Sequence, residues 1–211
     1  MQIILTALDS ALVNAWRTFC GDLACVTVHQ GSILDVPCDA VVSPANSFGF
    51  MDGGIDAVYM QYFGQTIQDK LQQQIFDYHH GELLVGDATV IETGHPETPF
   101  LIAAPTMRVP MILRDSVNPY LAARATLLLI KHGQFHAGQY AGKRVSDYIK
   151  TVAFPGLGTG VGQIGPQTCA HQVRAAIDDC LHEKYTRPHT WAEASERHQL
   201  LYTDRPKRLQ Y

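Results

Sequence analysis

Short apolar runs alternate along most of the chain with longer segments whose apolar residues recur at helical spacing. The runs at 39–43 and 100–104 are each stopped by a proline and are typical of strands buried on both faces. The predicted strands are residues 1–5, 25–29, 39–43, 87–93, 100–104 and 148–154. The predicted helices are residues 11–19, 55–74, 120–131 and 167–183. Because strands and helices alternate, the pattern predicts a three-layer α/β/α fold with helices on both faces of a sheet.

The end of the chain breaks this alternation. From residue 184 onward the sequence is polar and holds Pro188 and Pro206, which predicts a short helix followed by a loose tail. A length of 211 residues fits one domain and leaves little room for a second. We therefore expect a single domain over residues 1–183 and a polar C-terminal extension over residues 184–211.

Composition and charge exclude several classes of protein. A hydrophobic fraction of 46% is enough to build a core, and 16 Lys and Arg against 20 Asp and Glu argue against a strongly basic nucleic-acid binder. No apolar run approaches the ~20 residues that cross a bilayer, so we expect no membrane partner. The five cysteines form no C-x-x-C pair and the ten histidines no H-E-x-x-H motif. We expect free thiols, a cytoplasmic location and no metal.

A glycine-rich stretch after the strand at 148–154 is the first candidate site. Alternate glycines at Gly156, Gly158, Gly160 and Gly162 leave backbone N–H groups unshielded in front of a helix, and Thr159 adds a hydroxyl. Such a run of amides forms a nest for anionic oxygens. Phosphate or pyrophosphate binding is one interpretation of this stretch, and a glycine-rich surface loop is the other.

The same stretch contains a literal G-x-G-x-x-G at Gly160, Gly162 and Gly165. In a dinucleotide-binding enzyme this fingerprint opens a βαβ unit, and the second strand ends in an acidic residue. Here a mostly polar segment follows the helix at 167–183, so the sequence argues against a Rossmann dehydrogenase.

A second candidate site follows the strand at 39–43. Asn46 lies just beyond that strand, and Asp56 lies ten positions further on, at the start of a predicted helix. An amide that donates and accepts hydrogen bonds, near a carboxylate, suits a sugar hydroxyl together with a water that is to be oriented or deprotonated. The alternative interpretation is that Asp52 and Asp56 only cap the helix that follows.

Taken together, these segments resemble the macrodomain, an ADP-ribose-binding module. Macrodomains carry a strand ending in a Gly-Asp-Ile turn, then a V-N-A-A-N segment with a glycine-rich turn and G-V-D, and later an F-P-x-x-x-T-G-V loop. The matching segments in this chain are Gly31-Ser32-Ile33, Val42-Ser43-Pro44-Ala45-Asn46, Gly53-Gly54-Ile55-Asp56, Phe154-Pro155 and Thr159-Gly160-Val161. The resemblance covers roughly residues 24–183. It implies a mixed, mostly parallel sheet with ADP-ribose in a cleft at its carboxyl edge.

The resemblance also implies a role for each matching residue. Asn46 would contact hydroxyls of the distal ribose, and Asp56 would position or activate the water that attacks the anomeric carbon. The implied ligand-binding residues are Ser32, Ile33, Ala45, Gly53, Gly54, Ile55, Phe154, Gly156, Leu157, Gly158, Thr159, Gly160 and Val161. The implied partner is ADP-ribose or an ADP-ribosylated substrate, and no metal or redox cofactor is implied. The implied reaction removes ADP-ribose from a modified side chain or from a small acyl ester.

Three positions depart from the family pattern. Ser32 stands where the family has its adenine-reading aspartate, Ser43 replaces the first asparagine, and Asp52 replaces the first glycine of the triplet. Asp35, three residues after Ser32, is a candidate substitute for the missing carboxylate. Because of these departures three hypotheses stay open: an ADP-ribosyl hydrolase, a reader that binds ADP-ribose without turnover, and a domain that takes another phosphorylated metabolite.

Overall fold

A six-stranded sheet forms the centre of the computed structural model, which describes residues 1–44 and 46–203. Its strand order is β2-β1-β6-β3-β5-β4, and only β4 runs antiparallel to its neighbour, β5. The strands are β1 (Gln2–Ala7), β2 (Val26–Gln30), β3 (Ala40–Ser43), β4 (Thr89–Glu92), β5 (Phe100–Ala103) and β6 (Thr151–Phe154). The predicted mixed, mostly parallel sheet is therefore confirmed, and each predicted strand is present with its ends shifted by up to three residues. The strand predicted over residues 148–154 starts only at Thr151, because Tyr148 belongs to a short helix, α5 (Val145–Tyr148).

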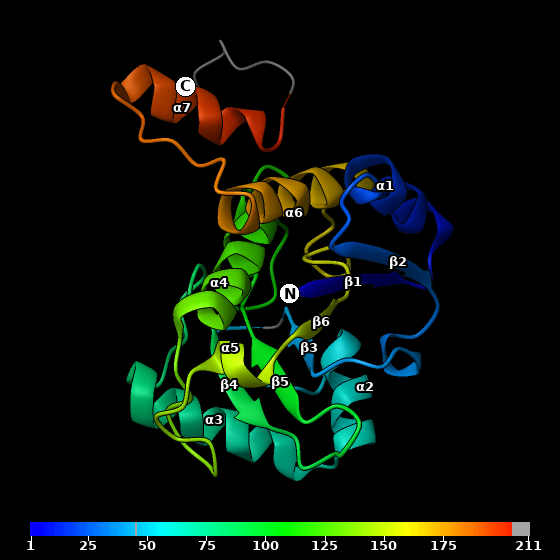
Figure 1. Ribbon diagram of the computed structural model, residues 1–211, viewed down its shortest axis with the longest axis vertical. Helices are drawn as coiled ribbons and strands as arrows, with labels where there is room; N and C mark the ends of the chain where they lie inside the picture. The colour runs from blue at the N-terminus through cyan, green and yellow to red at the C-terminus, as the bar shows by residue number, and fades with distance from the viewer. Residues whose placement is uncertain (45, 204–211) are drawn as a thin grey trace.

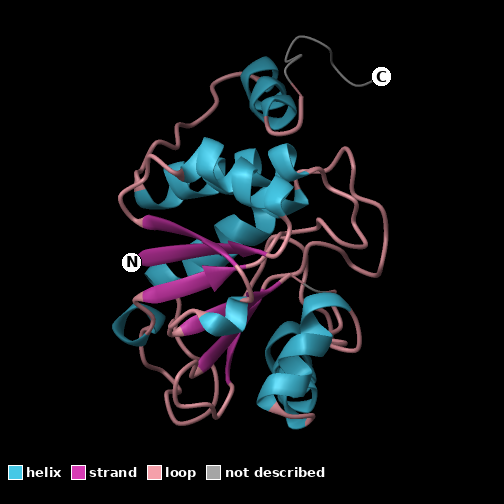
Figure 2. Cartoon of the chain, turned by 90° about the vertical axis from the view of Figure 1, so that its right-hand side faces the viewer, coloured by secondary structure: helices cyan, strands magenta, loops and turns pink. Residues whose placement is uncertain are grey.

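Helices cover both faces of this sheet (Figures 1 and 2). One face packs against α1 (Ser10–Cys20), α4 (Asn118–His132), α5 (Val145–Tyr148) and α6 (Pro166–Leu181). The other face packs against α2 (Gly54–Phe63), α3 (Thr66–His79) and the short 3-10 turn η1 (Ile33–Asp35). In the central strand β3, Val42 belongs to the first core and Val41 to the second, as the alternation of side chains along a strand requires. The three-layer α/β/α prediction is confirmed.

The helix predicted over residues 55–74 is wrong in one respect, because the structure divides it. Gly64 ends α2 with a φ of 95°, a positive value that glycine adopts at little cost because it has no Cβ atom, and α3 begins two residues later. The helical spacing continues through the break, so the hydrophobic pattern alone did not reveal it. Asp9 caps α1 and accepts a hydrogen bond of 3.1 Å from the Leu12 amide.

The C-terminal part holds one further helix, α7 (Trp191–Leu200), within the polar extension. Figure 1 shows it beyond α6, on the side away from the sheet. Nε2 of His171 on α6 lies 2.8 Å from the carbonyl oxygen of Leu200, which ties the end of α7 to the body. The tail predicted over the last residues falls outside the described part from residue 204 onward. Among the helices of the described residues, none is long and apolar enough to span a bilayer.

Candidate functional site

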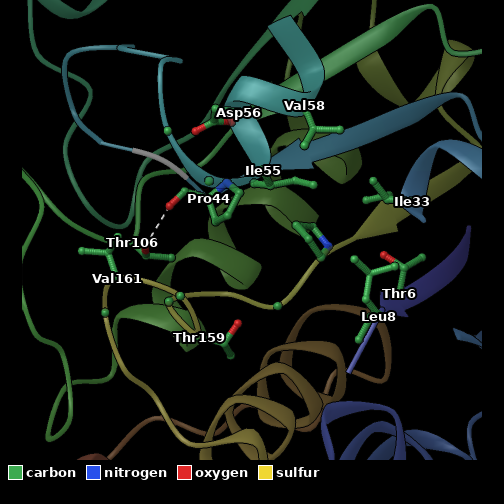
Figure 3. A pocket seen from close by; sticks show the side chains of 18 of the residues that line it. Thr6, Leu8, Ile33, Pro44, Ile55, Asp56, Val58, Thr106, Thr159 and Val161 are labelled. Carbon is green, nitrogen blue, oxygen red and sulfur yellow. Dashed lines mark hydrogen bonds between the residues drawn. The ribbon is translucent and has the colours of Figure 1, made fainter. Parts of the chain in front are cut away.

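A cavity of about 510 Å³ opens at the carboxyl edge of the sheet. Because β1, β2, β3, β5 and β6 are parallel, the segments that follow them meet at this edge, where ligands bind in open α/β sheets. The predicted site residues that line the cavity are Ser32, Ile33, Asn46, Gly53, Gly54, Ile55, Asp56, Gly156, Gly158, Thr159, Gly160 and Val161. Figure 3 shows Asp56 and Val161 toward one end of it and Thr6 and Leu8 toward the other.

The loop after β6 presents free backbone amides to this cavity. Within the part of the chain that the structure describes, the N–H groups of residues 158–161 donate no hydrogen bond to a protein atom. The loop is held instead through its carbonyl groups, since the amides of Ile164 and Leu113 donate to the oxygens of Gly158 and Gly162 at 3.0 and 2.7 Å. Free amides fixed in this way at the wall of a cavity suit the oxygens of a phosphate or diphosphate.

Gly156 is required by the packing of this loop. A Cβ atom at this position would lie 2.3 Å from Oγ1 of Thr159 and 2.7 Å from Cδ2 of Leu12. At Gly160, by contrast, a Cβ atom would meet nothing within 4 Å. Gly156 therefore allows the loop to pack closely against Thr159 and Leu12. Gly160 leaves open space beside the loop, which lines the cavity.

Asn46 holds the loop that follows β3. Its Oδ1 accepts hydrogen bonds from the amides of Phe48 and Phe50 at 3.1 and 3.2 Å, and its Nδ2 donates to the carbonyl oxygen of Phe50 at 2.8 Å. The amide therefore has a structural role that the sequence did not indicate, and its contact with a sugar stays a prediction. The loop it holds supplies Phe50 and Asp52 to the cavity wall.

Asp56 lies in the first turn of α2 and is only 4% exposed. Its Oδ1 accepts a hydrogen bond of 2.6 Å from the hydroxyl of Ser43. Burial raises the pKa of the Asp56 carboxyl from its ordinary 3.8 to about 7, and the hydrogen bond from Ser43 acts in the opposite direction. Since the N-cap of α2 is Gly53 and Asp56 points inward to Ser43, helix capping does not account for either aspartate.

Some of the predicted ligand-binding residues do not reach the cavity. Phe154 and Leu157 are 1% and 0% exposed and belong to the core between the sheet and α6, because the strand end and the loop turn these apolar side chains inward. Neither residue lines the cavity. Ala45 lies outside the described residues. Asp35, the candidate substitute for the missing carboxylate, is exposed and does not line the cavity either.

Two groups of lining residues were not predicted from the sequence. The end of β1 and the start of α1 contribute Thr6, Ala7, Leu8, Asp9 and Leu12, and the segment after β5 contributes Thr106, Met107 and Pro110. The first group could have been predicted, because β1 was expected to be a strand and the carboxyl ends of parallel strands meet at one edge of the sheet. The position of β1 beside β6 depends on the strand order, which local sequence does not contain.

No Lys, Arg or His appears among the described residues that line the cavity, whose charged side chains are Asp9, Asp52 and Asp56. Arg108, which follows the lining residue Met107, forms a salt bridge of 2.5 Å with Glu82 and stacks over the Phe48 ring. An anion in the cavity would therefore be held by backbone amides. Within residues 1–44 and 46–203, no three His, Cys, Asp or Glu side chains come together as a metal site requires.

Comparisons with known proteins agree with this architecture. The Macro domain model matches residues 42–173. An uncharacterized protein of Aquifex aeolicus is 30% identical over 73% of this chain and 79% of its own length. O-acetyl-ADP-ribose deacetylase 1 of Pantoea vagans is 27% identical over 76% of this chain and 85% of its own.

Solved structures show the same fold at low sequence identity. The macrodomain of Mycobacterium tuberculosis DarG has a TM-score of 0.57 and 19% identity, covering 72% of this chain and 90% of its own. A variant of the Oceanobacillus iheyensis macrodomain with ADPR also has a TM-score of 0.57. It is 17% identical, and the match covers 82% of this chain and 86% of that one. Because the Macro domain model matches more than half of its residues, this chain belongs to the Macro domain family.

Proposed function

We propose that this protein binds ADP-ribose in the cavity at the carboxyl edge of its sheet and hydrolyses an ADP-ribosyl bond there. The observation that carries the proposal is that the free amides of residues 158–161 share one cavity with Asn46 and Asp56. The amides would take the diphosphate, and the distal ribose would lie toward Asn46 and Asp56. The Oceanobacillus structure with ADPR and the name of the Pantoea relative support this class of ligand.

In the proposed reaction Asp56 accepts a proton from a water molecule. The hydroxide so formed attacks the anomeric carbon, or the acyl carbon of a small ester, and the bond to the leaving group breaks. The proton held by Asp56 then passes to the leaving group, which restores the carboxylate. A pKa of about 7, raised by burial, suits a group that must both take and return a proton near neutral pH.

A second candidate function is a reader that binds ADP-ribose without turnover. It is favoured by the engagement of the Asp56 carboxyl with Ser43 and by the use of the Asn46 amide within its own loop. Both candidate functions reside in the domain that we assign to residues 1–183, with residues 184–211 as an extension. They differ in a single measurable property, the release of ADP-ribose.

Calorimetric titration of ADP-ribose tests the shared part of the proposal. Gly160→Asp adds a carboxylate where the loop has open space, so we expect binding at least about tenfold weaker through repulsion of the diphosphate. Gly165→Asp is the matched control, because Gly165 also meets nothing within 4 Å, does not line the cavity, and stands at a helix N-cap that aspartate favours. Equal affinities for the two variants, or no binding by the unaltered protein, would overturn it.

Turnover separates the two candidates. An ADP-ribosylated acidic protein and an O-acetyl-ADP-ribose ester are each incubated with the unaltered protein and with Asp56→Asn. Release that depends on Asp56 supports the hydrolase. If both proteins bind ADP-ribose but release it from these substrates only at the uncatalysed rate, the protein is a reader without turnover.

A further inference from the structure

The end of the cavity opposite Asp56 is formed by two neighbouring strands. Ala7 at the end of β1 pairs with Gln30 at the end of β2, and the Gly31 amide donates to the carbonyl oxygen of Ala7 at 3.0 Å. The residues that follow these strand ends therefore lie side by side. Those that line the cavity here include Leu8, Asp9, Ser32 and Ile33. Figure 3 shows Leu8 and Ile33 near each other at this end.

The polar side chains at this end differ in whether their oxygen atoms already take part in hydrogen bonds within the protein. The Thr6 hydroxyl donates to the carbonyl oxygen of Phe154 at 3.2 Å. The Ser32 hydroxyl accepts from the Leu34 amide at 3.2 Å and so closes the η1 turn. Asp9 uses Oδ2 to accept from the Leu12 amide, whereas its Oδ1 accepts no hydrogen bond from any described residue. Asp9 is also the one charged side chain among the described lining residues at this end.

These observations, taken with the proposed function, set the orientation of a bound nucleotide. With the diphosphate on the amides of residues 158–161 and the distal ribose toward Asp56, the base would lie at the end of the cavity that Leu8 and Ile33 line. Apolar side chains suit the faces of a flat heterocycle. A free carboxylate oxygen only accepts hydrogen bonds, so it favours a base edge that carries an N–H donor and disfavours one that carries a carbonyl oxygen.

We propose that Asp9, the N-cap residue of α1 two positions beyond β1, is the residue that reads the base, selecting a nucleotide whose base carries an exocyclic amine. This inference rests on the proposed function for the orientation of the ligand. It assigns the selection to the carboxylate that begins α1, and to neither Ser32 nor Asp35. Asp9 thereby has two roles, with Oδ2 capping α1 and Oδ1 facing the ligand.

A pair of ligands that differ at one position tests this assignment. ADP-ribose carries an amine at C6 of its base, and inosine diphosphate ribose carries a carbonyl oxygen there. We expect calorimetry to show the unaltered protein preferring ADP-ribose about tenfold, the range of a hydrogen bond to a charged group at a solvated site. In Asp9→Asn the affinities for the two nucleotides should differ by no more than about threefold. Asparagine caps a helix as well as aspartate does, so the variant retains the start of α1.

Asp35→Asn is the matched control, because it makes the same chemical change at an exposed residue outside the cavity. We expect it to keep the full preference. The inference is overturned if the unaltered protein binds both nucleotides equally, if Asp9→Asn keeps the preference, or if Asp35→Asn loses it. Each of these results leaves binding at the cavity intact. Failure of both nucleotides to bind is a different result, which refutes the proposed function and the inference with it.

Discussion

The hydroxyl of Ser43 donates a hydrogen bond of 2.6 Å to Oδ1 of Asp56, and both side chains are buried. Ser43 ends β3 and Asp56 lies in the first turn of α2, so the bond joins the central strand to the helix that borders the cavity. The nearby Tyr59 hydroxyl donates to the carbonyl oxygen of Val42 at 3.0 Å. Ser43 therefore supplies the hydrogen bond that stabilises the ionised form of Asp56.

Replacing Ser43 by alanine should raise the pKa of the Asp56 carboxyl further above about 7, because the ionised form loses a buried donor. We expect a rise of about one unit. The measurement is the chemical shift of the Asp56 carboxyl carbon against pH, which does not depend on turnover. If the protein is a hydrolase, the pH at which its activity rises should move upward by the same amount.

Ser43→Thr is the control for that experiment, since it keeps the hydroxyl at the same position. Its Asp56 titration should lie closer to that of the unaltered protein than to that of Ser43→Ala. An unchanged midpoint in Ser43→Ala would mean that the short hydrogen bond does not stabilise the carboxylate.

The raised pKa of Asp56 also predicts how stability changes with pH. Below about pH 4 the carboxyl is protonated in both the folded and the unfolded state. As the pH rises from about 4 through 7 the unfolded state ionises first, so the free energy of unfolding falls, by at most ~1.4 kcal/mol for each pH unit. Asp56→Asn removes this titration. Urea unfolding at pH 5 and pH 8 should therefore show the unaltered protein losing more stability than the variant, and parallel losses would contradict the assignment.

Gly156→Ala should damage the loop after β6. Its new Cβ atom would lie within 3 Å of Thr159 and Leu12, so the loop or α1 must shift. We expect a loss of about 1–3 kcal/mol in the free energy of unfolding, as for other overpacked sites, together with weaker ADP-ribose binding. Gly160→Ala, in the same loop with open space around it, should change the unfolding free energy by less than ~0.5 kcal/mol. Equal stability of the two variants would show that the loop relaxes without cost.

The sequence predicted the strands and the layers because their signals are local. The runs that end at Ser43, Ala103 and Phe154 are apolar enough to mark buried strands, and parallel strands bring their carboxyl ends to one edge. The break at Gly64 was missed because the helical spacing of apolar residues continues across it. Asp9 was missed as a cavity residue because the position of the end of β1 between β2 and β6 depends on pairing between distant segments.

The three hydrogen bonds of the Asn46 side chain predict a structural effect that is separable from ligand binding. Asn46→Ala removes all three, so the free energy of unfolding should fall by about 1–3 kcal/mol, and the amides of Phe48 and Phe50 should exchange with solvent faster. Asn46→Asp keeps the two bonds that Oδ1 accepts and should protect these amides more than Asn46→Ala does. Hydrogen exchange without ligand measures this directly, with Asn14→Ala on the exposed face of α1 as the control. Unchanged exchange in Asn46→Ala would mean that the loop is held by its other contacts, which include the bond of 2.8 Å from the Met51 amide to Gln68.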